Sequence, residues 1–196
     1  MATSKVWGLV LAGGKSRRMG HDKALLLRDG ETQLSRAVQL LTPLVERVFV
    51  STTEAQSADP ERGKFEQVID RYENLGPVAG ILSAMDENAE VSWLVIACDL
   101  PNVDEQTIRL LLAERSDTQP FTAYTSSHDG LPEPLCAVYA PASRILIDAF
   151  VDEGIICPRK MLIRSDTHLL TQANPAALDN VNTPEDLERS NIRIAS

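Results

Sequence analysis

Short apolar runs and helical repeats of apolar residues alternate along the first 115 positions of the chain. Runs of apolar and β-branched residues predict buried strands over residues 6–12, 47–52, 66–70 and 92–99. Apolar positions at helical spacing predict helices over residues 34–45, 76–88 and 104–115. The polar stretch 57–64, which contains Pro60 and Gly63, is predicted to be a loop.

The second half of the chain has a less regular pattern. Two extended segments, 121–127 and 135–141, flank the Asp129-Gly130 pair, which indicates two strands around a loop. The remaining pattern predicts a helix over 142–154, a short helix over 158–166 and a strand over 167–172. At the end, "NVNTPEDLERS" predicts a helix with Thr183 as its N-cap and Pro184 at its first position.

The alternation of strands and helices predicts an α/β fold. Strands that are separated by helices favour a mainly parallel sheet with helices on both faces. A chain of 196 residues is expected to form one domain over residues 1–196. Ligands of such sheets bind at the carboxyl ends of the strands. Three polar features follow strands in this sequence, namely residues 13–23, Asp70 and Asp99.

Composition and charge narrow the classes of partner. The formal net charge of -9 and the acidic pI near 4.8 argue against nucleic acid or an anionic membrane as a partner, since both require a broad basic surface. No apolar run approaches the roughly 18 residues of a membrane span, and the N-terminus does not resemble a signal peptide. The three dispersed cysteines are expected to be reduced, buried thiols in a cytoplasmic protein.

The glycine-rich turn after the first predicted strand concentrates positive charge in an acidic chain. Its sequence, "LAGGKSRRMGHDK", fits neither the spacing of a P-loop nor that of a dinucleotide fingerprint. Gly13 and Gly14 would let backbone amides approach a ligand closely, and nearby basic side chains would neutralise phosphate. The alternative is an ordinary turn with solvated charges. The basic residues of the turn are Lys15, Arg17, Arg18 and Lys23.

Asp99 follows the most strand-like segment of the chain and precedes Leu100 and Pro101. A carboxylate at that edge of a sheet suits Mg²⁺, which takes one or two protein carboxylates and completes its shell with substrate phosphates and water. A simple turn aspartate is the alternative for Asp99, and more so for Asp70. The neighbouring Cys98 is interpreted as a buried strand thiol rather than as a nucleophile.

Four separated segments resemble the molybdenum cofactor guanylyltransferases, which are nucleotidyltransferases with a three-layer, glycosyltransferase-A-like Rossmann fold and a mainly parallel central sheet. These segments are "LAGGKSRRMGHDKALL" at 11–26, "LGPVAGILSAM" at 75–85, "ACDLP" at 97–101 and "NVNTPEDL" at 180–187. "EPLCAVY" at 133–139 is also similar to the family. The loop motif is shared with cytidylyl- and sugar-nucleotidyltransferases, and the doubled glycine and the "NVNTPEDL" ending favour the guanylyl branch.

The resemblance implies a reaction and a set of site residues. GMP would be transferred from GTP to molybdopterin with release of pyrophosphate, with Mg²⁺ as cofactor and with molybdoenzyme chaperones as further partners. Asp99 would hold Mg²⁺, Lys23 and Arg18 would act on the phosphates, and Asp70 would bind the guanosine part. The remaining implied contacts are Leu11, Ala12, Gly13 and Gly14 to the nucleotide, and Asn180 and Asn182 on the pterin side.

One position departs from the family pattern, and it leaves the base selectivity open. Ser51 stands where the family often has a nucleotide-binding asparagine, and a hydroxyl lacks the paired donor and acceptor of an amide. A cytidylyltransferase or another nucleotidyltransferase therefore remains an alternative. A non-catalytic nucleotide-binding homologue is a second one, although retention of Lys23 and Asp99 argues against it. A glycosyltransferase is a third, but the sequence has no Asp-x-Asp motif at the expected strand end.

Overall fold

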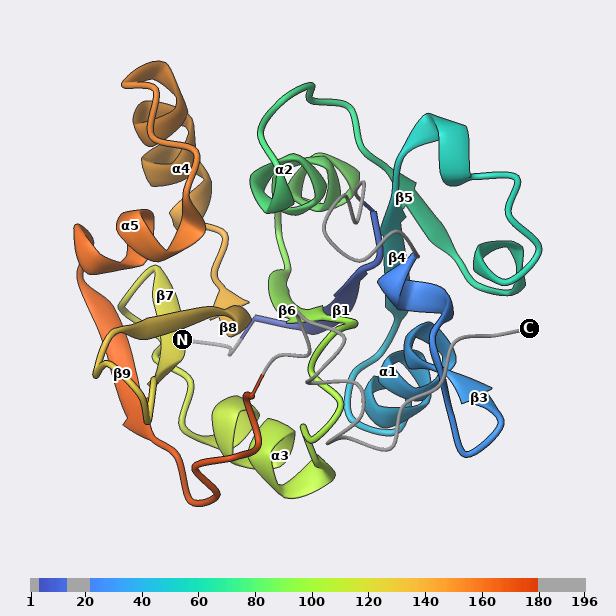
Figure 1. Cartoon of the computed structure of the whole chain (residues 1–196). Coiled ribbons are helices and arrows are strands. Elements are labelled where there is room, and N and C mark those ends of the chain that lie inside the picture. The colour runs from blue at the N-terminus through green and yellow to red at the C-terminus, as the bar shows by residue number, and fades with distance from the viewer. Residues whose placement is uncertain (1–3, 14–21, 180–196) are drawn as a thin grey trace.

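The computed structural model describes residues 4–13 and 22–179, and its centre is a seven-stranded sheet (Figure 1). The strands lie in the order β5-β4-β1-β6-β8-β7-β9. Their bounds are β1 Val6–Leu11, β4 Val48–Thr52, β5 Gln67–Ile69, β6 Ser92–Ala97, β7 Phe121–Thr125, β8 Pro132–Tyr139 and β9 Thr167–Thr171.

The sheet is mainly parallel, as the sequence predicts. β1 pairs in parallel with both β4 and β6, β4 pairs in parallel with β5, and β7 pairs in parallel with β9. β8 runs against its two neighbours, β6 and β7. The carboxyl ends of β5, β4, β1 and β6 therefore meet at one edge of the sheet, which is where a ligand of such a fold is expected.

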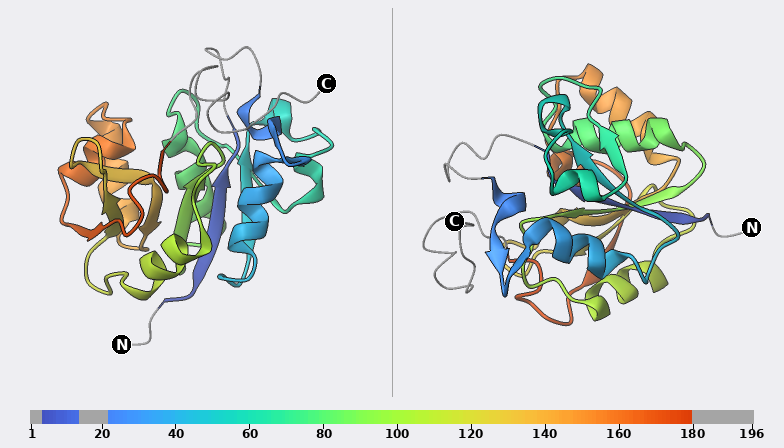
Figure 2. Two further views of the ribbon diagram at one scale, coloured as in Figure 1. Left: turned by 60° about the horizontal axis from the view of Figure 1, so that its bottom comes forward. Right: turned by 90° about the vertical axis from the view of Figure 1, so that its right-hand side faces the viewer.

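Helices cover both faces of the sheet (Figure 2). α1 and α3 pack on one face over an apolar cluster that includes Leu34, Val50 and Ile108. α2, α4 and α5 pack on the other face over a second cluster that includes Ile81 and Trp93. The helix bounds are α1 Gln33–Leu41, α2 Pro77–Glu87, α3 Glu105–Ala113, α4 Ser143–Asp152 and α5 Pro158–Ile163.

The predicted helices and strands within the described residues are present, and three local features differ from the predictions. α1 ends at Leu41 rather than near residue 45, because Pro43 has no backbone N–H to donate to the carbonyl four residues before it. Residues 57–64 are not loop throughout, since a 3₁₀ turn spans Arg62–Lys64. A short hairpin of β2 (Leu27–Arg28) and β3 (Glu31–Thr32) was not predicted, although Asp29 and Gly30 both have positive φ angles, of 56° and 86°, as its tight turn requires. The predicted C-terminal helix lies outside the described residues.

The cysteines are free thiols, and one prediction about them is wrong. Cys98 and Cys136 are buried, and burial raises the pKa of both thiols, that of Cys136 to about 12. Cys157 is exposed, because it precedes the first residue of α5 on the surface of the fold. The expectation that all three thiols are buried therefore fails for Cys157.

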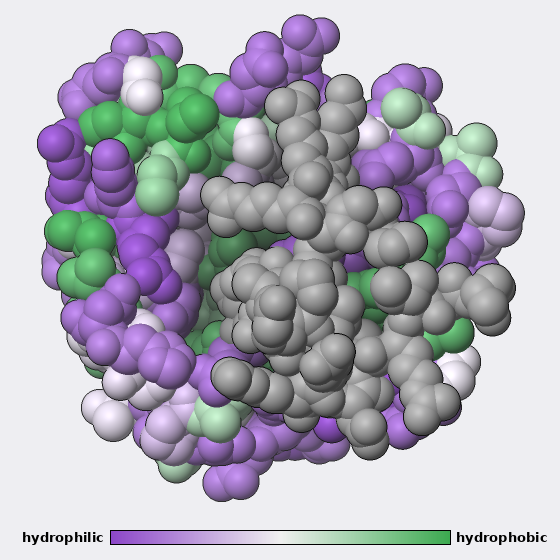
Figure 3. All heavy atoms as spheres, in the orientation of Figure 1, coloured by the Kyte–Doolittle hydropathy of each residue, from purple (hydrophilic) through white to green (hydrophobic). Residues whose placement is uncertain are grey.

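Exposed apolar side chains are concentrated on one side of the molecule. Ile145 of α4 is 77% exposed, and Ile156 and Ile163 lie near the two ends of α5. Figure 3 shows apolar surface at the upper left, over α4, on a face that is otherwise largely hydrophilic where it is coloured. No helix in the described part of the chain is long and apolar enough to cross a bilayer.

Candidate active site

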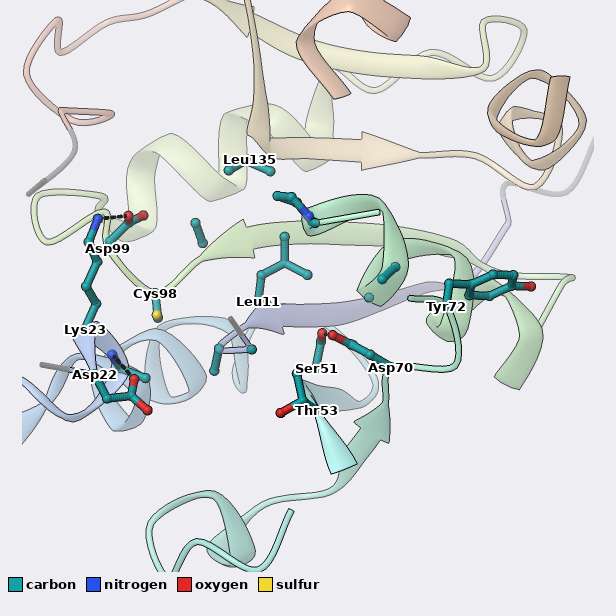
Figure 4. Close-up of a pocket in the computed structure, with 18 of the residues that line it drawn as sticks. Leu11, Asp22, Lys23, Ser51, Thr53, Asp70, Tyr72, Cys98, Asp99 and Leu135 are labelled. Atoms are coloured by element: carbon teal, nitrogen blue, oxygen red, sulfur yellow. Dashed lines mark hydrogen bonds and ion pairs between the residues drawn. The ribbon is translucent and has the colours of Figure 1, made fainter. Parts of the chain in front are cut away.

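A cavity of about 830 Å³ opens at the carboxyl edge of the parallel strands (Figure 4). Its volume is within the usual range for a small-molecule site, about 300–1,000 Å³. Residues at the ends of β1, β4 and β6 and residues that follow β1, β4, β5 and β6 line it, together with the start of α2 and one residue of β8. The lining includes Leu11, Ala12, Gly13, Asp22, Lys23, Ser51, Asp70, Tyr72, Gly80, Cys98, Asp99 and Leu135.

The end of β1 forms the middle of this cavity. Ala12 donates its N–H to the carbonyl of Ser51 over 3.1 Å, which ties the strand end to β4. A Cβ atom on Gly13 would lie 3.2 Å from Asp70 Oδ2 and 3.4 Å from the Cα atom of Thr52. Glycine at position 13 therefore leaves the room in which the Asp70 carboxylate sits beside the backbone.

Lys23 and Asp99 form an ion pair on one side of the cavity. The Lys23 ammonium donates to Asp99 Oδ2 over 3.0 Å, and the two side chains are 18% and 20% exposed. Lys23 begins a 3₁₀ turn whose N-cap is Asp22, and Asp22 Oδ1 accepts the N–H of Ala24 over 3.0 Å. The cap fixes the backbone that carries Lys23.

The second oxygen of Asp99 is the atom that suits a metal ion. Asp99 Oδ1 is buried, and no hydrogen-bond partner for it is found among the described residues. A buried carboxylate oxygen without a partner is costly unless something binds it. Among these residues no cluster of three or more His, Cys, Asp or Glu side chains is arranged for a metal. A single carboxylate fits Mg²⁺ that takes its other ligands from substrate phosphates and water.

Ser51 and Asp70 form a hydrogen-bonded pair on the other side of the β1 end. Ser51 Oγ donates to Asp70 Oδ1 over 2.7 Å. Burial raises the pKa of the Asp70 carboxyl above its usual 3.8, while the Ser51 hydroxyl opposes that shift. α2 packs so closely against the pair that a Cβ atom on Gly80 would lie only 2.2 Å from Ser51 Oγ. Ser51 thus orients Asp70, a role that the sequence did not suggest.

The structure brings together seven of the residues predicted for the site. Four others, Gly14, Arg18, Asn180 and Asn182, lie outside the described residues. The seven that line the cavity are Leu11, Ala12, Gly13, Lys23, Ser51, Asp70 and Asp99. The cavity also contains Asp22 and Tyr72, which the sequence reasoning did not single out.

Tyr72 is fixed at the rim of the cavity by a polar network. Its hydroxyl donates to Asp86 of α2 over 2.8 Å and accepts a hydrogen bond from Arg144 of α4 over 3.1 Å. Arg144 also pairs with Asp86. Because these partners come from elements far apart in the sequence, no local pattern could have placed Tyr72 here.

The fold and the site define the class of protein. A mainly parallel sheet carries a cavity for a small molecule at its strand ends, with a lysine–carboxylate ion pair on one side, an architecture typical of nucleotidyltransferases. Molybdopterin-guanine dinucleotide biosynthesis protein A from Archaeoglobus fulgidus has the same fold, with a TM-score of 0.78, 22% identity, and coverage of 94% of this chain and 96% of that one. CMP:2-keto-3-deoxy-manno-octonic acid synthetase, solved in complex with CTP, also shares the fold, with a TM-score of 0.73, 14% identity, and 96% and 97% coverage.

Residues 8–168 match the MobA-like NTP transferase domain, and the chain belongs to this family. It is 35% identical over 191 residues to a molybdenum cofactor biosynthesis bifunctional protein of Synechocystis sp., covering 97% of this chain but only 55% of that protein. It is 31% identical over 201 residues to a molybdenum cofactor guanylyltransferase of Shewanella halifaxensis, covering 99% and 98% of the two chains. The resemblance read from the sequence is confirmed at the level of the family.

Proposed function

We propose that this protein transfers GMP from GTP to the terminal phosphate of molybdopterin. An oxygen of that phosphate forms a bond to the α-phosphorus of GTP, the bond from the α-phosphorus to the bridging oxygen breaks, and its electron pair leaves with pyrophosphate. Family membership and the names of the relatives support this reaction. The observation that carries it is the pairing of Lys23 with Asp99 on one side of a cavity that has Ser51 and Asp70 on the other (Figure 4).

The Asp70 side of the cavity suits the guanine base. An ionised carboxylate only accepts hydrogen bonds, and the edge of guanine presents adjacent N–H donors. The Ser51 hydroxyl occupies one lone pair of Asp70 Oδ1, which leaves Oδ2, beside Gly13, to face the ligand. Backbone groups of Leu11, Ala12 and Gly13 would complete the nucleotide contacts. Ser51 therefore acts on the base through Asp70.

The Lys23 side suits the triphosphate. Transfer of a nucleotidyl group needs in-line positioning and charge neutralisation rather than a protein nucleophile. The Lys23 ammonium would release Asp99 and bind phosphate oxygens, together with Arg18. Asp99, through its buried Oδ1, would hold Mg²⁺, which when bound would supply further neutralisation of phosphate charge. Cys98 is not needed as a nucleophile, since burial raises the pKa of its thiol far above neutral.

Other parts of the proposal rest on the resemblance and on composition. Asn180 and Asn182 would contact the pterin, and molybdoenzyme chaperones would receive the product. A cytoplasmic location agrees with the free thiols Cys98, Cys136 and Cys157.

The test is a product assay with purified protein, molybdopterin and Mg²⁺. GTP, CTP and ATP are supplied separately, and the product is identified by mass. The proposal expects the guanine dinucleotide product and pyrophosphate from GTP, with little product from CTP or ATP. A preference for CTP would overturn the guanylyl assignment and leave nucleotidyl transfer standing, whereas nucleotide binding without pyrophosphate release would indicate a non-catalytic homologue.

A further inference from the structure

Arg62 is a buried charge that the proposed reaction does not use. It lies in the connection between β4 and β5, in the 3₁₀ turn Arg62–Lys64, and only 1% of it is exposed. Lone buried cations are strongly unfavourable, so a buried arginine must be matched by well-placed acceptors. The position of these acceptors indicates what Arg62 does.

The guanidinium bridges two residues that flank the glycine-rich turn in the sequence. Arg62 Nη2 donates to the carbonyl of Ala12 over 2.7 Å and to Asp22 Oδ2 over 2.7 Å. Ala12 directly follows β1, and Asp22 directly precedes Lys23. One side chain therefore sets the separation between the end of β1 and the turn that carries Lys23.

The contact with Asp22 reaches the phosphate side of the cavity in a short series of bonds. Asp22 uses Oδ2 for Arg62 and Oδ1 for the N–H of Ala24, so a single carboxylate joins the buried cation to the 3₁₀ turn. Gln56 Nε2 adds a 3.3 Å hydrogen bond to Asp22 Oδ2. Lys23, the first residue of that turn, then meets Asp99.

Arg62 also contacts a second carboxylate, that of Asp59. Asp59 Oδ1 accepts the backbone N–H of Arg62 over 3.1 Å and lies 3.5 Å from its Nη1 atom. The cation thus has carboxylates on two sides, and its planar fork can serve several acceptors at fixed angles. A lysine at this position would keep the charge but not that fork.

We propose that Arg62 is a positioning residue for nucleotidyl transfer, which holds Ala12 and Asp22 at a fixed separation and so sets Lys23 against the triphosphate. It does not touch the substrate. The inference rests on the proposed function for the identity of the ligand. Stability alone is a weak reason for this arrangement, because replacing a whole buried ion pair by apolar residues is often neutral or stabilising.

The test compares Arg62→Met in two backgrounds, wild type and Lys23→Ala. If Arg62 acts through Lys23, Arg62→Met should lower kcat/KM for GTP by about a hundredfold in the wild-type background, as a misplacement of about 1 Å does. In the Lys23→Ala background, Arg62→Met should lower kcat/KM for GTP by no more than about threefold, because no Lys23 ammonium is left to be displaced. A role in stability alone would lower kcat/KM by the same factor in both backgrounds, and that result overturns the inference.

Two further variants protect the test against loss of folding. Asp22→Asn keeps an acceptor for the N–H of Ala24 but removes the charge that pairs with Arg62, so it should lower kcat/KM in the same background-dependent way with a smaller loss of melting temperature. Arg109→Met removes an arginine of α3 that is 61% exposed and paired only with Glu105 in the described residues, and it should leave kcat/KM unchanged. Equal effects of Asp22→Asn in both backgrounds would also overturn the inference.

The wild-type measurements separate this inference from the proposed function. If wild-type protein binds GTP in a calorimetric titration but forms no product, the proposed transfer fails, and the two-background comparison is read from GTP affinity instead. A tenfold or greater loss of GTP affinity for Arg62→Met in the wild-type background alone would then support the positioning role. Wild-type protein that binds no nucleoside triphosphate would overturn both.

Discussion

The Lys23 ammonium lies 3.0 Å from Asp99 Oδ2, while the other oxygen of the same carboxylate is buried with no hydrogen-bond partner among the described residues. The two carboxylate oxygens of Asp99 therefore differ in whether they have a hydrogen-bond partner among the described residues. Oδ2 balances a cation that belongs to the chain, and Oδ1 is available to a cation from outside it. Under the proposed function, this asymmetry would let Asp99 pair with Lys23 through one oxygen and hold Mg²⁺ through the other.

Removal of the Asp99 charge should abolish transfer with little change in the fold. Asp99→Asn keeps the size of the side chain, but an amide oxygen is a weaker ligand for Mg²⁺. We expect Asp99→Ala and Asp99→Asn to lose more than about a hundredfold in kcat, since electrostatic stabilisation by a metal is worth several kcal/mol. The check is the initial rate against Mg²⁺ concentration. A Mg²⁺-dependent rate within a few-fold of wild type would remove Asp99 from the metal site.

Loss of the Lys23 charge should weaken GTP binding and slow transfer. One charge-assisted hydrogen bond to phosphate is worth about 1.5–3 kcal/mol, or roughly 10- to 150-fold in kcat/KM. Lys23→Arg keeps the charge and should recover part of the loss, whereas Lys23→Met should resemble Lys23→Ala. Calorimetric titration with GTP and steady-state kinetics measure the two effects. Unchanged affinity and rate in Lys23→Ala would place the phosphate contacts elsewhere.

The central sheet and the position of its cavity could be read from the sequence because local patterns determine both. Residues 93–98 form a continuous apolar run, and most of this run lies in the fully buried β6. Since parallel strands bring their carboxyl ends to one edge, Lys23, Asp70 and Asp99 could be expected together although they are far apart in the chain. A rule of topology, rather than any single motif, predicted the site.

Contacts between distant polar residues could not be predicted in the same way. Arg62 lies in the polar stretch 57–64, for which the sequence predicts a loop, and its burial depends on Ala12 and Asp22, which only the folded chain brings near. The Ser51–Asp70 pair is similar, because each residue was predicted to face a ligand rather than the other. The hairpin turn at Asp29-Gly30 did carry a local signal, but its strands are too short to form a pattern.

The ionised carboxylate of Asp70 should lower the free energy of unfolding at neutral pH. Its pKa is raised by burial, so the folded state binds the proton more tightly than the unfolded chain does. The resulting stabilisation is fully present below pH 3.8 and is lost as the pH rises through the folded-state pKa. Asp70→Asn should therefore melt at a higher temperature than wild type at pH 7, and the gap should close below pH 3.8.

The same variant should lose activity with GTP. Two N–H donors of guanine would lose an ionised acceptor, which is worth about 1.5–3 kcal/mol for a charged hydrogen bond. Thermal melting from pH 3 to pH 8 and kcat/KM for GTP measure the two effects. A lower melting temperature for Asp70→Asn at pH 7 would show that the ionised carboxylate stabilises the fold.

Glu61 should make the protein sensitive to acid. The Lys64 ammonium is the main cause that lowers the Glu61 pKa from 4.5 to about 2, and hydroxyl donors from Ser35 and Thr32 add to it against the opposing effect of burial. The depressed pKa means that the stabilisation is present above pH 4.5 and is lost as the pH falls through about 2. As the pH falls from 4.5 to about 2, the free energy of unfolding should therefore decrease less for Glu61→Gln than for wild type.

Thermal or urea unfolding between pH 2 and pH 6 measures this difference. Glu105→Gln is a suitable control, because Glu105 is an exposed residue paired with Arg109 on the surface of α3. Parallel pH profiles for wild type and Glu61→Gln would contradict the assignment. The Glu61 contacts also join the 3₁₀ turn that carries Arg62 to the start of α1, where Thr32 is the N-cap.

Glycine at position 80 should be needed for stability, because any larger residue there would crowd the Ser51 hydroxyl that donates to Asp70. Alanine ordinarily stabilises a helix by about 1 kcal/mol relative to glycine. At position 80, however, its Cβ would lie 2.2 Å from Ser51 Oγ and 2.9 Å from Leu11 Cδ2, and the hydroxyl cannot move away without losing Asp70. Overpacking of this kind costs about 1–3 kcal/mol, so we expect Gly80→Ala to destabilise the protein despite its higher helix propensity.

The Ser51→Ala background decides whether the hydroxyl is the cause. Without Oγ, the closest remaining atoms to the new Cβ are Leu11 Cδ2 at 2.9 Å and the Cβ of residue 51 at 3.0 Å, so Gly80→Ala should cost less there than in wild type. Urea unfolding of wild type, the two single variants and the double variant gives the coupling free energy.

The same geometry predicts that Ser51→Asn, although it restores the side chain frequent in the family, lowers stability, because Ser51 is only 2% exposed and has no space toward α2. Additive free energies, or a Ser51→Asn variant as stable as wild type, would show that the cavity wall yields and that the close packing of α2 on Ser51 does not control the orientation of Asp70.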